Sequence, residues 1–118
     1  MGISIQVYMD SPAPGDVTLD AMTGGFTVAG RIYPSDPAYT VRGFLVRPDP
    51  SNPADPVNRM EAGGLVLTPG PGGAGMTYSM TFGSVPANMQ FVSLMLAVVV
   101  QDGNDLGGTG FTIRCILP

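Results

Sequence analysis

Hydrophobic residues recur at every second position in several separate stretches of this 118-residue chain, with polar residues between them. The pattern runs through residues 3–9, 26–32, 76–82 and 111–117. Successive side chains of a β-strand point to opposite sides of a sheet, so each stretch predicts a strand with one buried face and one face in water. No ten-residue stretch shows the period of an amphipathic helix. The chain is therefore expected to fold as β-structure alone.

Shorter apolar stretches predict further strands. Residues 41–47 and 65–68 are apolar enough for two more, and residues 17–19 predict a short edge strand. Clusters of Gly, Pro, Asp, Asn and Ser separate the stretches and are typical of turns. Seven or eight short strands at this spacing favour an antiparallel sandwich of two sheets over a small barrel. We predict a single domain over residues 1–118, in which Cys115 points into the core.

The composition agrees with a folded domain. Apolar residues make up 44% of the chain and are gathered in periodic runs, which a disordered chain lacks. The seventeen glycines and twelve prolines lie mostly between these runs. Because Cys115 is the single cysteine, no disulfide can form within the chain, and the hydrophobic core must stabilise the fold without one.

The residue types that carry most enzyme chemistry near neutral pH are missing. The chain has no histidine, no lysine and no tryptophan, so it has no imidazole base, no Ser-His or Cys-His pair and no amine nucleophile. An enzyme would depend on carboxylates alone. The available carboxylates lie in predicted loops or at strand ends, where turn formation and solubility explain them: Asp10, Asp16, Asp20, Asp36, Asp49, Asp55 and Glu61. We therefore predict a protein that is not an enzyme and has no cofactor.

Charge and hydropathy exclude two classes of partner. The net charge is −4, and five arginines form no basic cluster, so a nucleic acid is not expected as a ligand. The N-terminus lacks the basic region and continuous apolar block of a signal peptide. The longest apolar stretch, residues 91–100, is about half of what a membrane-spanning helix needs, so no membrane insertion is expected.

Four segments carry motifs of a known family: GFTVAGRI at 25–32, TVRGFLV at 40–46, VVVQDGND at 98–105 and GFTI at 110–113. The first two resemble the B and C strands of bacterial and phage immunoglobulin-like domains, and the last two resemble their F strand with its F–G turn and their G strand. The resemblance implies an immunoglobulin-like β-sandwich that serves adhesion, spacing or display and has no catalytic residues. The chain lacks the paired cysteines and core tryptophan of antibody domains, which leaves the subfamily open.

Two groups of side chains are candidates for ligand binding. Asp102, Asn104 and Asp105 gather oxygen atoms in one turn, as a hard cation requires, but Asp and Asn beside Gly are also typical of tight hairpins. No distal glutamate follows, so the turn is a weak cation candidate and no metal site is assigned. Tyr33 and Tyr39 flank one predicted turn and are candidates for stacking on a glycan, although tyrosines at strand ends also cover cores.

The stretch 91–100 is apolar on both of its faces, whereas one face of a sandwich strand is normally in water. Either the long excursion over residues 48–75 covers one face, or that face contacts another subunit. We predict a binding interface that contains Leu94, Leu96, Val98 and Val100. The proline-rich residues 48–56 predict an extended arm, which is either an ordered loop or a contact to a neighbouring subunit.

These observations predict a non-enzymatic structural or binding module that docks on protein through an apolar surface. The partner is a second copy, with a homo-oligomer expected, or a larger assembly. We expect a virion component, such as a phage capsid decoration or tail protein on the virion surface. The alternatives are a spacer or adhesion domain of an extracellular or cell-surface bacterial protein, and a weak carbohydrate-binding module.

Overall fold

The computed structural model describes residues 5–36, 38–48, 59–70 and 75–118. These residues form nine β-strands and the short 3-10 helix η2 (Ala87–Met89), and the described part of the chain contains no α-helix. The all-β prediction is confirmed. Ile3, Asp49, Asp55 and nearly all of the predicted proline-rich arm lie outside the described residues.

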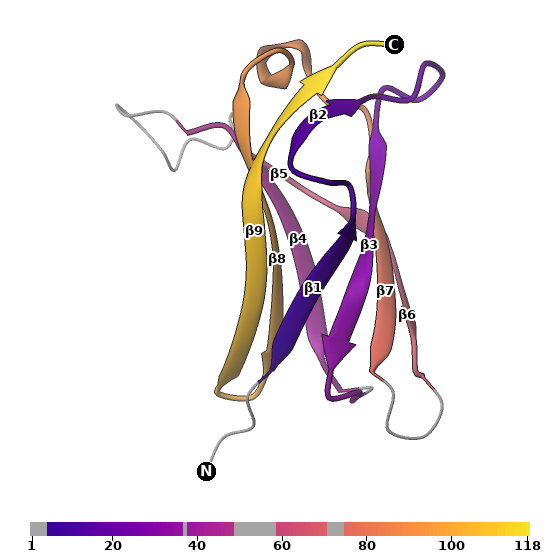
Figure 1. Cartoon of the computed structure of the whole chain (residues 1–118), viewed down its shortest axis with the longest axis vertical. Coiled ribbons are helices and arrows are strands. Elements are labelled where there is room, and N and C mark those ends of the chain that lie inside the picture. Colours follow the sequence, from indigo (N-terminus) through magenta and orange to yellow (C-terminus); the bar gives the residue numbers. More distant parts are fainter. Residues whose placement is uncertain (1–4, 37, 49–58, 71–74) are drawn as a thin grey trace.

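The strands form two sheets that face each other (Figure 1). The four-stranded sheet contains, in spatial order, β1 (Gln6–Ser11), β3 (Phe26–Tyr33), β7 (Met76–Phe82) and β6 (Gly63–Thr68). The five-stranded sheet contains β2 (Gly15–Thr18), β9 (Asp105–Ile116), β8 (Ser93–Asp102), β4 (Thr40–Val46) and β5 (Arg59–Glu61).

The predicted alternation is confirmed where the pattern was strongest. In β3 and β7 every second residue is buried, and the buried set is the apolar one. One hydrophobic core lies between the sheets, and its completely buried members include Val28, Ile32, Phe82, Leu45 and Leu96. Period-two burial therefore places one face of each sheet against the other and leaves the opposite faces in water.

One pair of strands is parallel, which corrects the prediction of a wholly antiparallel fold. β2 pairs with β9 in parallel, with Gly15 beside Ile113 and Thr18 beside Ile116. The two prolines between β1 and β2, Pro12 and Pro14, have no backbone N–H and cannot extend the β1 ladder. The chain therefore leaves the four-stranded sheet after Ser11 and joins the edge of the other sheet without reversing its direction (Figure 1).

Three further predictions were incomplete. The last strand was expected over residues 111–117, after a turn of Asp, Asn and Gly, but β9 begins at Asp105, because the hairpin from β8 has only two turn residues and pairing starts directly after them. The three-residue strand β5 was missed, since so short a segment has no detectable period. Leu117, which was grouped with the core residues, lies beyond β9 and is 51% exposed.

A glycine in the centre of β3 makes room for a buried tyrosine. Gly30 pairs with Tyr78 on β7, and a Cβ atom at position 30 would lie 2.5 Å from the Tyr78 hydroxyl. The hydroxyl of Tyr78 donates a 2.9 Å hydrogen bond to the carbonyl oxygen of Tyr8 on β1. Burial raises the pKa of Tyr78 to about 12. This contact links three neighbouring strands of one sheet from the core side.

The hydrogen bond predicts a measurable contribution to stability. We expect Tyr78→Phe to lower the free energy of unfolding by about 1 kcal/mol, because the substitution removes the hydroxyl and keeps the ring. The control is Tyr8→Phe, whose hydroxyl bonds only the exposed side chain of Gln6 and whose loss should cost less than about 0.5 kcal/mol. Urea denaturation of both variants measures the difference, and equal losses would contradict this role of Tyr78.

The thiol of Cys115 lies in the core, as the sequence predicted. Burial raises its pKa to about 11. The thiolate is the reactive form of cysteine, so both the pKa and the lack of access slow its reactions.

We predict that iodoacetamide alkylates Cys115 of the folded protein at pH 8 at least roughly 100-fold more slowly than it alkylates the unfolded chain, since each pKa unit removes a factor of ten in thiolate. Mass spectrometry of samples quenched over time, with and without urea, measures both rates. Fast alkylation of the folded chain would show that the β2–β9 edge opens readily.

Candidate functional site

The apolar strand β8 is central to the five-stranded sheet, but its predicted interface lies on the wrong face. Leu94, Leu96, Val98 and Val100 are at most 1% exposed and belong to the core between the sheets. The same strand directs Met95, Ala97 and Val99 to the outside, where Met95 is 42% and Val99 is 36% exposed. The four predicted residues thus hold the fold together, and the outward set is the accessible one.

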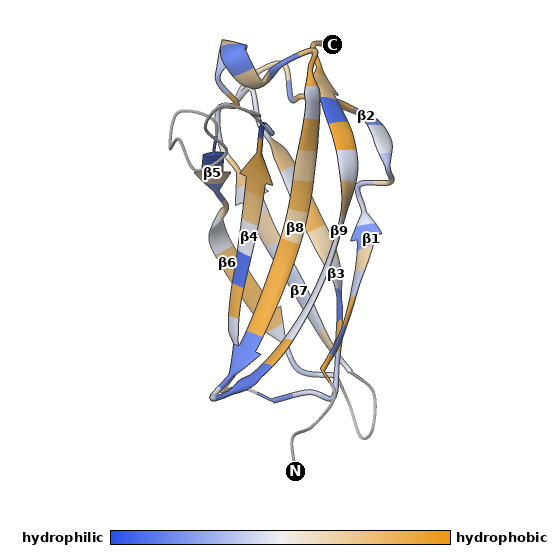
Figure 2. Ribbon diagram, turned by 90° about the vertical axis from the view of Figure 1, so that its left-hand side faces the viewer, coloured by the Kyte–Doolittle hydropathy of each residue, from blue (hydrophilic) through white to orange (hydrophobic). Residues whose placement is uncertain are grey.

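The outward set of β8 continues onto β4. Phe44 pairs with Ala97 and Val46 pairs with Met95, so the outward side chains of the two strands lie beside each other. We call these five residues the outer apolar face: Phe44, Val46, Met95, Ala97 and Val99. Figure 2 views the sheet that carries this face and shows β8 as hydrophobic along most of its length. An apolar group of this kind on a sheet face in water is typical of a contact site.

On the other side of β8, two successive outward positions of β9 have no side chain, between Leu106 at one end and Thr112 at the other. Ala97 pairs with Gly110 and Val99 pairs with Gly108, both on β9. A Cβ atom at Gly110 would lie 2.9 Å from the carbonyl oxygen of Leu96, so the close approach of the two backbones itself requires glycine here. The result is a flat strip beside the outer apolar face, in which the backbone of β9 is exposed.

Two arginines flank Phe44, the largest side chain of the face. The guanidinium carbons of Arg42 and Arg59 each lie 5.0 Å from the centre of the Phe44 ring. Arg42 also forms an ion pair with Glu61 of β5. Each cation–π contact is an electrostatic attraction between the guanidinium and the ring, worth about 0.5–1 kcal/mol at an exposed site.

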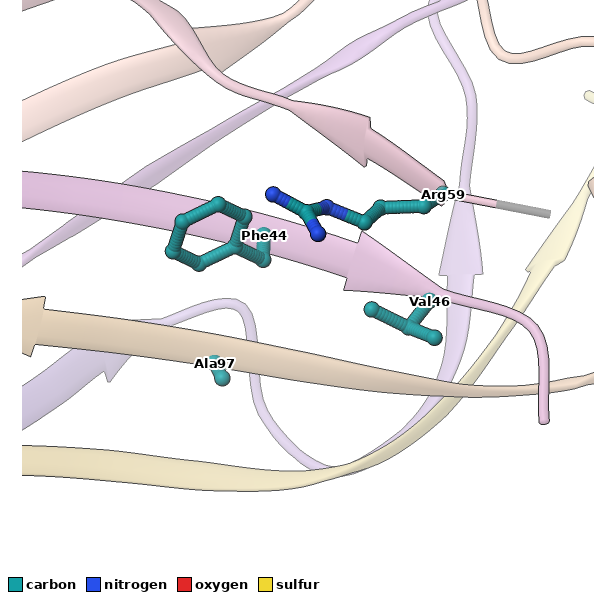
Figure 3. Close-up of a pocket in the computed structure, with 4 residues that line it drawn as sticks. All are labelled: Phe44, Val46, Arg59 and Ala97. Atoms are coloured by element: carbon teal, nitrogen blue, oxygen red, sulfur yellow. The ribbon is translucent and has the colours of Figure 1, made fainter. Parts of the chain in front are cut away.

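An open hollow of about 340 Å³ lies between Phe44, Val46, Arg59 and Ala97. Figure 3 shows its lining, with the guanidinium of Arg59 directed toward the Phe44 ring and Ala97 on the neighbouring strand. Arg59 is the one ionisable residue of this lining, and a guanidinium does not exchange protons near neutral pH. The hollow can take an apolar side chain and an anionic group, and the described residues of its lining include no acid, base or nucleophile.

The carboxylates predicted as surface groups have structural partners. Asp10 accepts two hydrogen bonds from Arg31, and Asp16 accepts two from Arg114. Asp20 accepts hydrogen bonds from the backbone amides of Met22 and Thr23 in a turn.

These two amide hydrogen bonds lower the pKa of Asp20, because they stabilise the charged form. Asp36 likewise accepts a hydrogen bond from the amide of Ala38 in the next turn. Each of these carboxylates therefore closes a turn or joins two strands.

The two tyrosines predicted for glycan stacking are not brought together. Tyr39 is 6% exposed and belongs to the core, where burial raises its pKa. Tyr33 instead packs edge-on against Tyr8, with ring centres 5.8 Å apart, on the outside of the four-stranded sheet. The guanidinium of Arg31 lies over the Tyr8 ring at 5.4 Å. Arg31 therefore covers one face of the Tyr8 ring, and Tyr33 contacts the same ring edge-on.

A second hollow, of about 300 Å³, lies on the same side of the four-stranded sheet. Its lining includes Thr68, Thr77 and Ser79, and its one carboxylate is that of Asp10, which Arg31 holds. Its described lining also includes Ala29 and Val66, so the hollow has a mixed polar and apolar surface.

The turn proposed as a weak cation site is the hairpin between β8 and β9. Asp102 pairs with Asp105, and Gly103, with φ of 58°, takes the first of the two turn positions. The carbonyl oxygen of Gly103 accepts a hydrogen bond from the side chain of Gln101. Within the described ranges, no group of three or more Asp, Glu, Cys or His side chains is placed to hold a metal ion. Asp102, Asn104 and Asp105 are accounted for by the hairpin geometry.

No helix in the described part of the chain is long and apolar enough to cross a membrane. Neither the comparison with protein-family models nor the comparison with curated protein sequences finds a match to this chain. The geometry of the outer apolar face is therefore the evidence for the candidate site.

Two signals could have located the outer apolar face from the sequence. A two-residue turn at Gly103 and Asn104 fixes the β8–β9 register, in which Gly108 and Gly110 lie beside Val99 and Ala97. The larger aliphatic side chains of β8 then belong inside, since glycines opposite them would leave a hole in the core. The pairing of Phe44 with Ala97 had no such signal, because it joins strands far apart in the sequence.

One face of β8 is buried and the other lies in water. A single carboxylate should therefore affect stability strongly on the first face and weakly on the second. Leu96→Glu should prevent folding, since it places an unpaired carboxylate in the core at a cost above about 4 kcal/mol. Val99→Glu should change the free energy of unfolding by less than about 1 kcal/mol, because position 99 faces water. Far-ultraviolet circular dichroism with urea denaturation distinguishes the variants. A folded Leu96→Glu protein would show that the faces are reversed.

Proposed function

We propose that this protein is an immunoglobulin-like domain without catalytic activity, which works by docking on protein through the outer face of its five-stranded sheet. The observation that carries the proposal is the outer apolar face. Five hydrophobic residues lie together on a sheet face in water, and two of them are more than a third exposed. Among the described residues, the first hollow is lined by one ionisable group, Arg59, and the one carboxylate of the second, Asp10, is held by Arg31.

The order of the strands supports the immunoglobulin-like part of the proposal. The segments that resemble the B, C, F and G strands form β3, β4, β8 and β9. In these domains, A, B, E and D form one sheet, and C, F and G form the other. The order β1-β3-β7-β6 then corresponds to A-B-E-D, and the order β9-β8-β4 corresponds to G-F-C. The strand β5 would extend the second sheet as C′.

The chemistry of the face supports docking on protein. Protein interfaces have an apolar centre and a polar rim, and they are enriched in aromatic residues, Met and Arg. Here Phe44 and Met95 lie in the apolar centre, with Arg42 and Arg59 beside them. The guanidinium groups stay in water when the face is free and can pair with carboxylates when it is covered.

The outer face of the other sheet has a different character. Its outward residues include Thr27, Arg31, Thr77 and Thr81, all of them exposed. Its exposed hydrophobic residues, Tyr8 and Val66, lie apart from each other on the two edge strands, β1 and β6. A sheet face of this composition is stable in water without a partner. The contrast between the faces assigns docking to one side of the molecule.

A virion surface is the setting that we propose for this module, because a small domain with one apolar face can attach to a larger protein shell and present its polar face outward. A spacer or adhesion domain of a bacterial surface protein is the alternative setting. The two differ in what covers the face, which is a shell protein in the first and a neighbouring domain or receptor in the second.

Paired variants test the docking face in the source of the protein. Ala97→Glu places a carboxylate in the middle of the outer apolar face, and Ala29→Glu places one at an outward, half-buried position of β3 on the polar side. In a sedimentation gradient of a lysate, the associated protein moves with large assemblies. We expect epitope-tagged Ala97→Glu to lose more than about nine-tenths of this association, since a buried unpaired charge costs about 2–5 kcal/mol at an interface. Ala29→Glu should stay associated.

Gradient sedimentation with quantitative immunoblotting measures the associated fraction. Circular dichroism first establishes that both variants fold. Equal retention of both variants would refute the proposal, and so would selective loss of Ala29→Glu, because docking would then use the polar face.

A further inference from the structure

On the outer face of the five-stranded sheet, side chains stand on one side of β8 and are missing at two positions on the other side. Phe44 stands on β4, on one side of Ala97, and Gly110 leaves bare backbone on β9, on the other side of Ala97. All three residues lie in one row across the strands. Neighbouring strands are about 4.8 Å apart, so the ridge and the strip lie at equal distances from β8.

This arrangement is complementary to itself under a two-fold rotation. If a second copy faces the first, with the rotation axis parallel to β8 and passing over Ala97, then β4 of each copy lies over β9 of the other. The ring of Phe44 then rests on the side-chain-free backbone at Gly110, twice in the pair. An isologous contact of this kind closes at two subunits and leaves no free apolar edge to propagate.

The two-fold axis can lie in the plane of the contact in two directions, parallel or perpendicular to β8. The charges favour the parallel one. An axis perpendicular to the strands would place β4 over β4 and bring Arg42 and Arg59 of both copies around the two Phe44 rings. Like charges brought together cost energy at an interface. The axis parallel to β8 separates them, since it places β4 and β5 over β9 and β2.

The same axis directs Arg59 toward a carboxylate. Among the described residues, Arg59 has a cation–π contact with Phe44 and no ion pair. The β2 edge, which would lie opposite β5, carries Asp16, whose side chain is 51% exposed in its pair with Arg114. Arg59 of one copy therefore comes near the Asp16–Arg114 ion pair of the other, where it can share the Asp16 carboxylate.

The size of the face suits a reversible dimer. Four strands at about 4.8 Å spacing and ten residues at about 3.3 Å give roughly 600 Å² per copy. Two copies would bury roughly 1,200 Å² in all, at the lower limit of specific interfaces. Such a pair exchanges with monomers in solution.

We infer that the occupant of the outer apolar face is a second copy of this chain, packed face to face about a two-fold axis parallel to β8, with Phe44 of each copy over Gly110 of the other. The inference rests on the proposed function, in which this face docks on protein, and it names a second copy of the chain as the protein that covers the face in place of a shell protein or a receptor.

The first experiment is sedimentation equilibrium of the full chain over a hundredfold range of concentration. We expect the mean mass to rise from 12.2 kDa for one chain toward about twice that value. Ala97→Glu, which brings two carboxylates together at the axis, should raise the dissociation constant by more than about 30-fold. Ala29→Glu should leave it unchanged.

A monomer at every concentration would overturn the second copy as the occupant. If Ala97→Glu still loses its association in the source of the protein, a different protein covers the face and the proposed function stands. If neither experiment responds to Ala97→Glu, both proposals fail. A mass above the dimer would overturn the two-fold arrangement.

Crosslinking with a short bis-maleimide tests the axis. The rotation places Val46 of one copy opposite Thr112 of the other, since both pair with Met95. Sheets that pack face to face lie about 10 Å apart, which is too far for a disulfide and within reach of a bis-maleimide with a spacer of that length. A mixture of Val46→Cys and Thr112→Cys chains should therefore form crosslinked dimers with this reagent, at least about tenfold more than either variant alone. Cys115 is buried and adds no background.

Crosslinking of one variant alone, or absence of crosslinks in a sample that sediments as a dimer, would overturn the parallel axis. Ala29→Cys is the control for random collision, because it lies on the opposite face.

Discussion

The fold depends on burying one face of each sheet against the other. Side chains from every strand except β5 and β6 supply fully buried core residues, and these two strands add the partly buried Met60 and Leu67. The sheets come close where side chains are missing. A Cβ atom at Gly43 would lie 2.2 Å from the sulfur of Met80, so the methionine of one sheet occupies the space above the glycine of the other. Packing at this density fixes which side of each strand faces outward.

Once the inner faces are fixed, the two outer faces are free to differ, and they do. The face of the four-stranded sheet carries threonines and the Arg31–Asp10 ion pair on its central strands, and exposed Tyr8 and Val66 on its two edge strands. The face of the five-stranded sheet carries Phe44, Met95 and Val99. The core does not include the outer side chains. The stability of the fold therefore does not explain why apolar residues lie on the outer face. Their concentration on one sheet is the physical basis for assigning a partner to it.

The shape of that face comes from glycine as much as from hydrophobic residues. Gly108 and Gly110 allow β9 to approach β8 closely and leave a strip without side chains. Arg42 and Arg59 contact Phe44 on the other side. A ridge and a flat strip at equal distances from a central strand form a surface that a second copy can match.

The sequence by itself determined the strands and most of the core, because burial with a period of two is written locally in residues such as Met76, Tyr78 and Met80. It also determined the limits on chemistry, through the absence of histidine and lysine. The tertiary structure alone decided which face of β8 is covered, that β2 runs parallel to β9, and that Phe44 lies beside Ala97. These features depend on pairing between distant segments, and a strand that is apolar on both faces carries no local signal for which face the other sheet will cover.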